Sequence, residues 1–469
     1  MHDQIKRDKR RQIPAVSKIL DALGNFVLPR PFVVEIVRRK LSVIRANGAS
    51  SGFEATLADI RRSLDQLRAT RLQPVINGTG IVIHTNFGRA PLASEAMHAV
   101  NEIGPAYSNL EYDVVSGERG GRGAYVENAL ALLCKAEAAT VVNNCAAALV
   151  LIVRLFTGKG GRHSATARTG KPDASEVVIS RGELVQIGGG FRITEILEAS
   201  GANLREVGAT NKTTLEDYAQ AVGPKSAMIL KVHRSNFFMS GFVESPPSNE
   251  ISALAKKNRI PFVEDLGSGV MIANASLGIA ENEPTPADVL KAGPDLVCFS
   301  GDKLFGGPQA GIIAGKKRFV AALKREPLFR ALRCDKLCLA ALQTTVDLHL
   351  TEKINEIPAL ALLQTSEDAL RRRAAAIVAN LADLPIEIAV GRGNAKTGGG
   401  TLPKSNVPSV TIDFVPTDWS LTEFSARLRA ANPPVIGYIA DNRFKLDLRT
   451  IFPRQDDILM KAIRATCRK

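Results

Sequence analysis

The stretch DLVCFSGDKLFGGPQAGIIAG, residues 295–315, contains two apolar runs with a lysine between them. LVCFS and GIIAG have the length of buried strands, and neither alternates with polar residues. Fully apolar strands of this kind occur in sheets that helices cover on both faces. Lys303 follows the first run, and Gly306 and Gly307 would let a flat ligand approach the backbone closely.

The same pattern extends on both sides of this stretch. From about residue 73, short apolar runs alternate with helix-length segments, which predicts a parallel or mixed sheet with helices on both faces. Ligands of such sheets bind at the carboxyl ends of the strands. The polar residues predicted to lie there are Asn143, Asn144, Arg181, Glu183, His233, Asp265, Asp302 and Lys303.

The periodicity divides the chain into three predicted domains. Residues 1–72 carry apolar residues at helical spacing and predict a small helical domain with a basic face. Residues 73–349 form the predicted sheet domain, and residues 350–469 a small α+β domain. The polar, glycine-punctuated segment from Gly158 to Ser175 is predicted to be an exposed insertion, of a role that the sequence does not reveal.

The composition is that of a folded globular chain. Of 469 residues, 45% are hydrophobic and 23% charged, which excludes wholesale disorder. The longest uncharged apolar run, Cys145 to Val153, is too short to cross a bilayer, and neither a secretory signal nor a membrane partner is expected. Six cysteines without a C-x-x-C pair favour a reducing, cytoplasmic location.

The positive charge is unevenly distributed. The net charge is +14, and residues 1–75 hold 15 basic and 7 acidic side chains, a net +8. Such a segment suits a polyanion, because each neutralised phosphate releases counterions. Charge alone fits a solvated helical surface equally well.

Three features follow one another along the predicted sheet domain. The first is a small-residue helix start after a strand, VVNNCAAAL, where backbone N–H groups can bind a phosphate. The second is Asp265 in FVEDLGSG, and the third is Lys303. Each alone also fits a structural role: a helix–sheet contact, an N-cap and a solvated loop lysine.

In this order the three features predict a pyridoxal 5'-phosphate site. The helix start would hold the phosphate, Asp265 would keep the ring nitrogen protonated and Lys303 would capture the aldehyde. A dinucleotide site is not favoured, because no G-x-G-x-x-G follows a strand. No metal site is expected, because the six histidines are scattered and no ligands are paired at zinc spacing.

A second group of candidates is cationic. Arg330 and Arg333 in FRALRCDK lie three residues apart and share one face if the segment is helical, and Lys336 would extend that face. Together with Arg89 they could bind a phosphate or another tetrahedral oxyanion, although a solvated basic helix remains open. His84 and His233 are either active-site residues or buried structural imidazoles.

At these residues the chain resembles a known family, bacterial L-seryl-tRNA(Sec) selenium transferase (selenocysteine synthase). The motifs that carry the resemblance are INGTGIVIHTNFGRAPL, LEYD, NNCAAAL, ISRGELVQIGGGFRI, EVGATNKT, KVHRSNF, VEDLGSG, SGDKLFGGPQAGII and RALRCDK. It covers nearly the whole chain. Arg234, Cys145 and Tyr438 stand where the family usually has other residues.

The resemblance implies a fold-type-I pyridoxal-phosphate transferase with a large mixed seven-stranded sheet domain, a small C-terminal α+β domain and an N-terminal helical domain that binds tRNA. It implies conversion of L-seryl-tRNA(Sec) to L-selenocysteinyl-tRNA(Sec) with selenophosphate as donor, through an aminoacrylyl-tRNA. It also implies a homo-oligomer built from dimers, a decamer, with active sites at dimer interfaces.

The resemblance also assigns residues. Lys303 matches the Schiff-base lysine and Asp265 the ring-nitrogen partner, while Arg89, Arg330 and Arg333 match the arginines for selenophosphate. The implied cofactor pocket further includes Ser300, Asn144, Cys145, Ala146 and Gln186. His84 and His233 are candidate catalytic residues for the acid step that expels the seryl hydroxyl.

Two alternatives stay open at this point. A related pyridoxal-phosphate lyase acting on a small amino acid or amino sugar would share the core but has no use for a basic N-terminal domain. A non-catalytic RNA-binding protein with this fold would have no need for Lys303.

Overall fold

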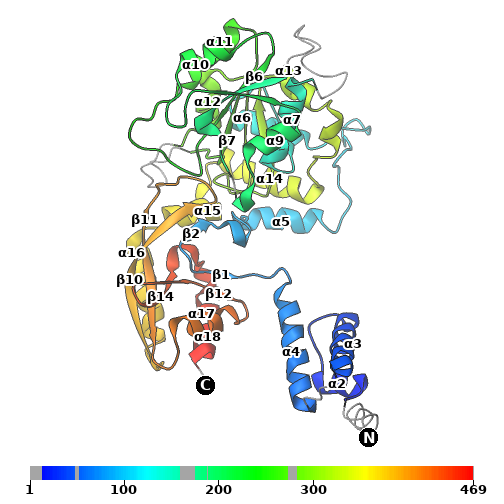
Figure 1. Cartoon of the computed structure of the whole chain (residues 1–469), viewed down its shortest axis with the longest axis vertical. Coiled ribbons are helices and arrows are strands. Elements are labelled where there is room, and N and C mark those ends of the chain that lie inside the picture. Colours follow the sequence, from blue (N-terminus) through cyan, green and yellow to red (C-terminus); the bar gives the residue numbers. More distant parts are fainter. Residues whose placement is uncertain (1–12, 48–51, 159–174, 187, 273–282, 468–469) are drawn as a thin grey trace. The chain divides into compact units, whose positions relative to one another are not determined.

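The computed structural model describes most of the chain. The described residues are 13–47, 52–158, 175–186, 188–272 and 283–467. The chain splits into two compact units, Met1–Pro74 and Val75–Lys469 (Figure 1). The predicted insertion from Gly158 to Ser175 lies almost wholly outside the described residues. A further domain boundary at residue 349 stays a prediction.

The first unit is helical, as predicted. Its helices are α2 (Val16–Leu23), α3 (Arg30–Asn47) and α4 (Phe53–Ala69). Apolar residues at helical spacing form one core among them, and Ile19, Leu41 and Ile60 have no exposed surface. The polar faces of these helices therefore remain on the surface of the unit.

A seven-stranded mixed sheet dominates the second unit, which confirms the predicted sheet. The strands run in the order β3-β9-β8-β7-β6-β4-β5. Only β9 is antiparallel to its neighbours, so the other six strands end at the same edge. Their bounds are β3 (Ala138–Val142), β4 (Glu176–Ser180), β5 (Asn203–Val207), β6 (Ser226–Val232), β7 (Phe262–Gly267), β8 (Leu296–Ser300) and β9 (Gly311–Gly315).

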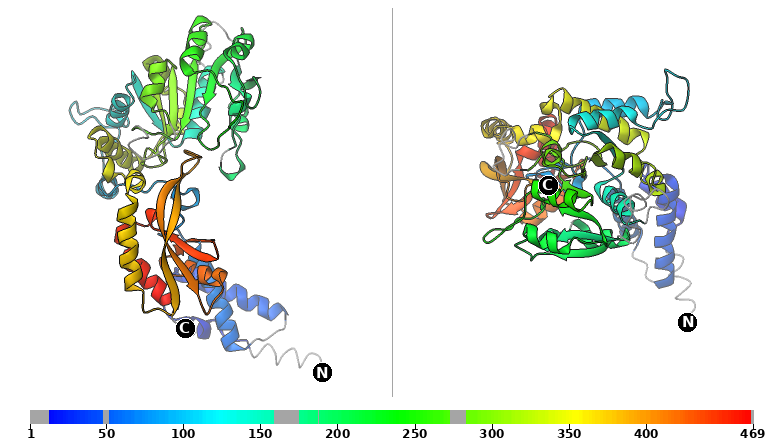
Figure 2. Two further views of the ribbon diagram at one scale, coloured as in Figure 1. Left: turned by 90° about the vertical axis from the view of Figure 1, so that its left-hand side faces the viewer. Right: turned by 90° about the horizontal axis from the view of Figure 1, so that it is seen from above.

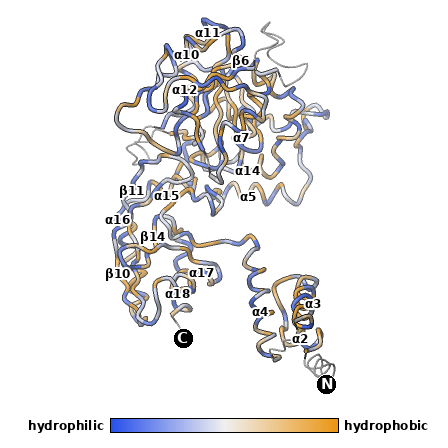
Figure 3. The backbone as a smooth tube through the Cα atoms, viewed as in Figure 1, coloured by the Kyte–Doolittle hydropathy of each residue, from blue (hydrophilic) through white to orange (hydrophobic). Residues whose placement is uncertain are grey.

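Helices cover both faces of this sheet. α7 (Cys145–Phe156), α9 (Ile193–Ala199) and α13 (Lys317–Leu323) pack on one face. The other face is covered by α6 (Ala124–Leu133), α10 (Leu215–Ala221), α11 (Ser248–Lys257) and α14 (Lys336–Leu350). The enclosed strands are mainly apolar in the hydropathy colouring (Figure 3), which is the burial that their unbroken apolar runs predicted.

A second sheet of five strands lies towards the C-terminus, in the order β13-β14-β11-β10-β2. β10 (Ile386–Gly398) and β11 (Val407–Pro416) form its long antiparallel pair, drawn in orange in Figure 2. The glycine-rich stretch GRGNAKTGGG, residues 391–400, begins within β10, where a Cβ at Gly391 would come within 2.5 Å of a carboxylate oxygen of Asp413. The glycines thus leave room for buried polar side chains of the neighbouring strands.

The remaining elements complete this unit. β1 pairs with β12, and β2 joins β10, so the start of the unit belongs to the C-terminal sheets. The bounds are β1 (Ile76–Asn77), β2 (Ile81–Ile83), β12 (Val435–Ile436), β13 (Tyr438–Ala440), β14 (Arg443–Asp447), α5 (Ser94–Ile103), α12 (Pro286–Ala292), α15 (Pro358–Gln364), α16 (Glu367–Asn380), α17 (Leu421–Arg429) and α18 (Asp456–Cys467).

No helix in the described part of the chain has both the length and the apolar character needed to span a membrane.

A buried histidine of α14 holds the segment that follows Lys303. The Nε2 atom of His349 lies 2.9 Å from the carbonyl oxygen of Phe305, and because a carbonyl only accepts, Nε2 carries the proton. The two rings also pack, with centroids 4.8 Å apart. Burial lowers the pKa of His349 from 6.5 to about 4.

The buried histidine makes the stability of the fold depend on pH. Between pH 6.5 and about 4, the imidazole of His349 is protonated in the unfolded chain but neutral in the folded one. The free energy of unfolding therefore decreases as the pH falls through this window. Glutamine at position 349 can still donate a hydrogen bond to Phe305 but does not titrate. We therefore expect the free energy of unfolding of His349→Gln to decrease by up to about 3 kcal/mol less over this window than that of the unaltered protein. Chemical denaturation at several pH values measures it.

The exposed His98 supplies the matched control. Its side chain is 77% exposed, so His98→Gln removes no buried imidazole and should not reproduce the effect of His349→Gln. Identical pH profiles for His349→Gln and the unaltered protein would contradict a neutral buried imidazole.

Candidate active site

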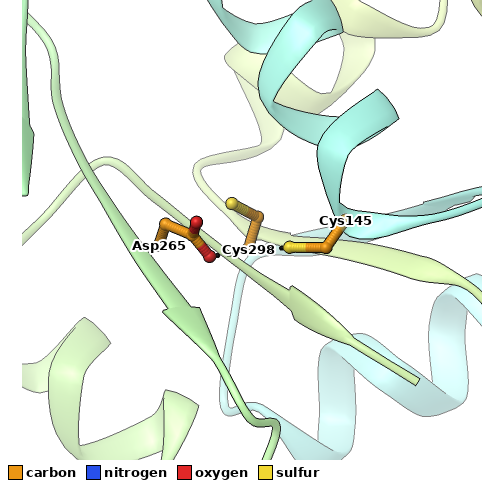
Figure 4. A group of neighbouring side chains, drawn as sticks. All are labelled: Cys145, Asp265 and Cys298. Atoms are coloured by element: carbon orange, nitrogen blue, oxygen red, sulfur yellow. Dashed lines mark hydrogen bonds between the residues drawn. The ribbon is translucent and has the colours of Figure 1, made fainter. Parts of the chain in front are cut away.

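Asp265 lies at the carboxyl end of β7, inside the sheet edge. The strand register pairs it with Val232 of β6 and Cys298 of β8. Its side chain faces α7, where the Cys145 thiol lies 3.5 Å from Oδ1 (Figure 4). Burial raises the pKa of Asp265, while the charge of Lys303 acts in the opposite direction.

Lys303 lies in the turn that follows β8 and is half-buried. The backbone N–H of Gly267 donates to Asp265 Oδ1 over 3.0 Å. A Cβ placed on Gly267 would lie 3.0 Å from Ser235 Oγ and 3.8 Å from Lys303 Nζ. Gly267 has a φ of +67°, which favours glycine, and a side chain at this position would also lack room. Lys303, Asp265 and Ser235 therefore meet around a gap that a larger residue would fill.

The amino end of α7 completes this region. The side chain of Asn144 caps the helix, accepting from the Ala147 N–H over 2.8 Å. A Cβ on Gly311 would come within 2.1 Å of the Asn144 carbonyl oxygen, so strand β9 presses directly against the start of the helix. The first-turn N–H groups of Cys145 and Ala146 have no acceptor within the helix, which makes this end suited to an anion.

Two further cofactor candidates differ in their placement. Ser300 ends β8, is buried, and lies two residues from Cys298, so both side chains share the face of the strand that α7 covers. Gln186 is exposed, and its carbonyl oxygen accepts from the Asn236 side chain over 2.8 Å. The structure therefore brings Ser300, but not the exposed side chain of Gln186, into the buried sheet edge.

His233 lies next to Asp265 through the backbone, since its N–H donates to the Asp265 carbonyl oxygen over 2.8 Å. Its ring instead approaches Glu283, with Nε2 3.1 Å from Oε2, and Ser268 also donates to that carboxylate. Burial by itself would lower the pKa of His233, but the hydrogen bond and charge of Glu283 outweigh it and raise the pKa.

His84 directly follows β2. Its ring stacks on Phe87 at a centroid distance of 3.9 Å, and burial lowers its pKa. Its carbonyl oxygen accepts from the Arg89 N–H, and the Arg89 guanidinium binds Asp302 over 2.9 Å. Because Asp302 directly precedes Lys303, this chain of contacts connects His84 and Arg89 to the lysine turn.

Arg330 and Arg333 line a separate cavity of about 460 Å³ together with Arg122 and Lys324. Arg333 and Arg122 both bind Glu111, over 3.2 and 2.9 Å. Arg89 is not among the residues that line this cavity. The structure thus brings two of the three predicted anion-binding arginines together.

The helical interpretation of this segment is wrong at Arg333. A short 3-10 helix, Pro327–Arg330, ends before it, and α14 begins only at Lys336. The Lys336 ammonium binds the carbonyl oxygens of residues 103, 104 and 106 instead of extending the cationic face. Irregular backbone, rather than a helix face, positions the two arginines.

Sequence reasoning missed three residues of this region: Cys298, Ser235 and Glu283. Cys298 had a signal, because it lies two positions before Ser300 in a strand and must share its face. Ser235 and Glu283 had none, since their positions depend on how the loops after the strands fold back towards Gly267 and His233.

The chain is similar to several known proteins. The family model of L-seryl-tRNA selenium transferase matches residues 75–452. An L-seryl-tRNA(Sec) selenium transferase of Aquifex aeolicus (strain VF5) is 40% identical over 97% of this chain and 98% of its own length. One of Geobacter metallireducens (strain ATCC 53774 / DSM 7210 / GS-15) is 43% identical over 95% of this chain and 96% of its own length.

A solved structure shares the fold. The structure of D-glucosaminate-6-phosphate ammonia-lyase has a TM-score of 0.60 and 20% sequence identity, and covers 86% of this chain and 97% of its own. This likeness concerns the fold alone and agrees with the predicted fold-type-I class. The lyase alternative is not favoured, because relatives at about twice that identity carry the transferase name.

The family match covers residues 75–452, and the match to the relatives extends over nearly the full length of both chains. Lys303 and Asp265 lie together within it at the sheet edge. This chain belongs to the L-seryl-tRNA selenium transferase family.

Proposed function

We propose that the chain converts L-seryl-tRNA(Sec) to L-selenocysteinyl-tRNA(Sec), the activity for which its relatives are named. The observation that carries the proposal is the meeting of Lys303 and Asp265 around Gly267, beside the amino end of α7. An amine, a buried carboxylate and a helix N-terminus are the three groups that the predicted chemistry needs, and the fold places them at one strand edge.

The residues present fit pyridoxal phosphate, the cofactor that the family resemblance implied. When bound, this cofactor supplies an electron-withdrawing ring that stabilises negative charge at the Cα of an attached amino acid. Lys303 would hold it covalently, and the first turn of α7 would bind its phosphate. Asp265 would hold the proton on the ring nitrogen, which places a positive charge beside the buried carboxylate.

The chain's own residues can also move the protons. The ε-amine of Lys303 would take the Cα proton of the seryl group. Loss of the seryl hydroxyl needs an acid, for which His84 and His233 are the candidates. The raised pKa of His233 keeps more of its imidazole protonated near neutral pH, so we favour His233 over His84.

We assign selenophosphate binding to the cavity that Arg330 and Arg333 line. Guanidinium groups bind tetrahedral oxyanions through paired, charged hydrogen bonds. Arg122 and Lys324 also line the cavity, where they are paired with Glu111 and Glu127. Glu111 also orients Arg333. The Arg89 guanidinium binds Asp302, the residue before Lys303, and we propose that this contact positions the turn that carries Lys303.

The helical unit would bind the tRNA. Arg38 and Arg39 of α3 are exposed, whereas the neighbouring Lys40 is paired with Asp59 over 2.8 Å. Exposed arginines on a helix bind phosphates without needing a base sequence. A decamer built from dimers and a cytoplasmic location stay predictions from the sequence.

The decisive experiment incubates the chain with seryl-tRNA(Sec) and selenophosphate and identifies the aminoacyl group by mass spectrometry. We expect selenocysteine from the unaltered chain and none from Lys303→Ala, which should also lose the visible absorbance of bound cofactor. Lys212→Ala is the control, because Lys212 is exposed and paired only with Glu244. Conversion of free serine, without tRNA, would instead favour a lyase.

The arginine cavity predicts a selective defect. Arg330→Ala with Arg333→Ala should raise the KM for selenophosphate about tenfold or more, because a charged hydrogen bond contributes about 1.5–3 kcal/mol. Cofactor absorbance should not change. Arg325→Ala is the control, since Arg325 is exposed outside the cavity. Equal loss of cofactor binding and of selenium transfer would show that the assignment is wrong.

The exposed arginines of α3 predict a salt-dependent effect. Arg38→Glu with Arg39→Glu should weaken tRNA binding and lower the slope of log affinity against log salt by roughly 1 to 2, because fewer counterions are released. Filter binding at several salt concentrations measures both. Lys256→Glu with Lys257→Glu, an equal charge change on α11, is the control. The same loss in both variants would argue against a site on α3.

A further inference from the structure

Three side chains at the sheet edge bring two thiols and a carboxylate together. The ligand atoms of Cys145, Asp265 and Cys298 all lie within 4.8 Å of one another (Figure 4). Cys145 and Asp265 are 120 residues apart in sequence, so no spacing motif reveals the group. Elsewhere in the described residues no other three such side chains meet this closely.

The fold fixes all three positions. Asp265 and Cys298 are register partners in the adjacent parallel strands β7 and β8. Cys145 is the first residue of α7, the helix that covers the same face. Cys298 has no exposed surface and Asp265 is 8% exposed, whereas Cys145 is only partly buried. The positions of Asp265 and Cys298 are therefore fixed by the buried sheet, and solvent reaches the group at Cys145.

Two sulfurs and one oxygen form a donor set for thiophilic cations. Zn²⁺ binds thiolate sulfur at about 2.3 Å and carboxylate oxygen at about 2.0–2.2 Å in a tetrahedron, which separates ligand atoms by about 3.6 Å. The Cys145 sulfur and the Asp265 oxygen are already 3.5 Å apart. The three ligand atoms lie at most 4.8 Å from one another, so they need to move by about 1 Å to reach the spacing of a tetrahedral site. Water can supply the fourth ligand.

We propose that, in the absence of the cofactor, Cys145, Cys298 and Asp265 bind a thiophilic divalent cation such as Zn²⁺ or Cd²⁺. The ion and pyridoxal phosphate exclude one another, because each engages the carboxylate of Asp265. This exclusion rests on the proposed function, whereas binding of the ion does not. The proposal replaces the sequence-based expectation of no metal site.

The test uses the full-length protein freed of cofactor. Titration with CdCl₂ alone should produce the ultraviolet thiolate-to-cadmium absorbance, saturating at one ion per chain. Cys145→Ala and Cys298→Ala should each weaken binding by about 100-fold or more, since each removes a ligand. Circular dichroism establishes that both variants are folded.

The other thiol pair supplies the matched control. Cys334 and Cys338 share a side-chain hydrogen bond, but among the described residues they form no group of three close ligand atoms, so Cys334→Ala with Cys338→Ala should keep the absorbance unchanged. Absorbance that survives in folded Cys145→Ala and Cys298→Ala, or that disappears in the control, would overturn the site.

A second titration separates this inference from the proposed function. Protein saturated with pyridoxal phosphate should show no cadmium absorbance, and Cd²⁺ added first should prevent the visible band of the cofactor. Simultaneous binding of both would overturn the exclusion. A cofactor-free protein that binds no Cd²⁺ would overturn the metal site while leaving selenium transfer by the loaded enzyme intact.

Discussion

The parallel alignment of β6, β7 and β8 is the constraint on which the site depends. Because these strands end at one edge, His233, Asp265 and Lys303 arrive there from three separate segments. The register places Asp265 beside Cys298, and α7 covers the same face with its amino end towards them. Burial disfavours the charged form of the Asp265 carboxylate, and the positive charge of Lys303 acts in the opposite direction.

The proposed anion-binding arginines are positioned by irregular backbone and not by a strand edge. Arg330 and Arg333 lie in irregular backbone between a 3-10 helix and α14, and Glu111 holds Arg333 from a loop far away in sequence. Arg330 in this cavity is exposed to solvent, whereas Asp265 is buried at the sheet edge. An exposed entrance for a charged donor and a buried place for the cofactor suit the two halves of the proposed reaction.

Asp265 takes part in both the proposed chemistry and the metal inference, through different neighbours. With the cofactor bound, Asp265 would hold the ring nitrogen, as proposed above; on this chain its Oδ1 lies 3.5 Å from the Cys145 thiol. Cys145 is the residue that links these states, since it also begins the helix proposed to bind the phosphate. One buried carboxylate cannot serve both partners at once, which is the physical reason for the exclusion.

The sequence by itself determined the helical first unit, the mixed sheet and the order of Asn144, Asp265 and Lys303, because apolar periodicity and strand-end polar residues are local signals. The sequence did not predict β5, because this edge strand is largely exposed and carries charged residues instead of an apolar run. Only the tertiary structure decided that Cys145 and Cys298 meet at Asp265, and that Arg89 lies apart from Arg333. Such contacts depend on strand register and on the paths of loops, which no local pattern encodes.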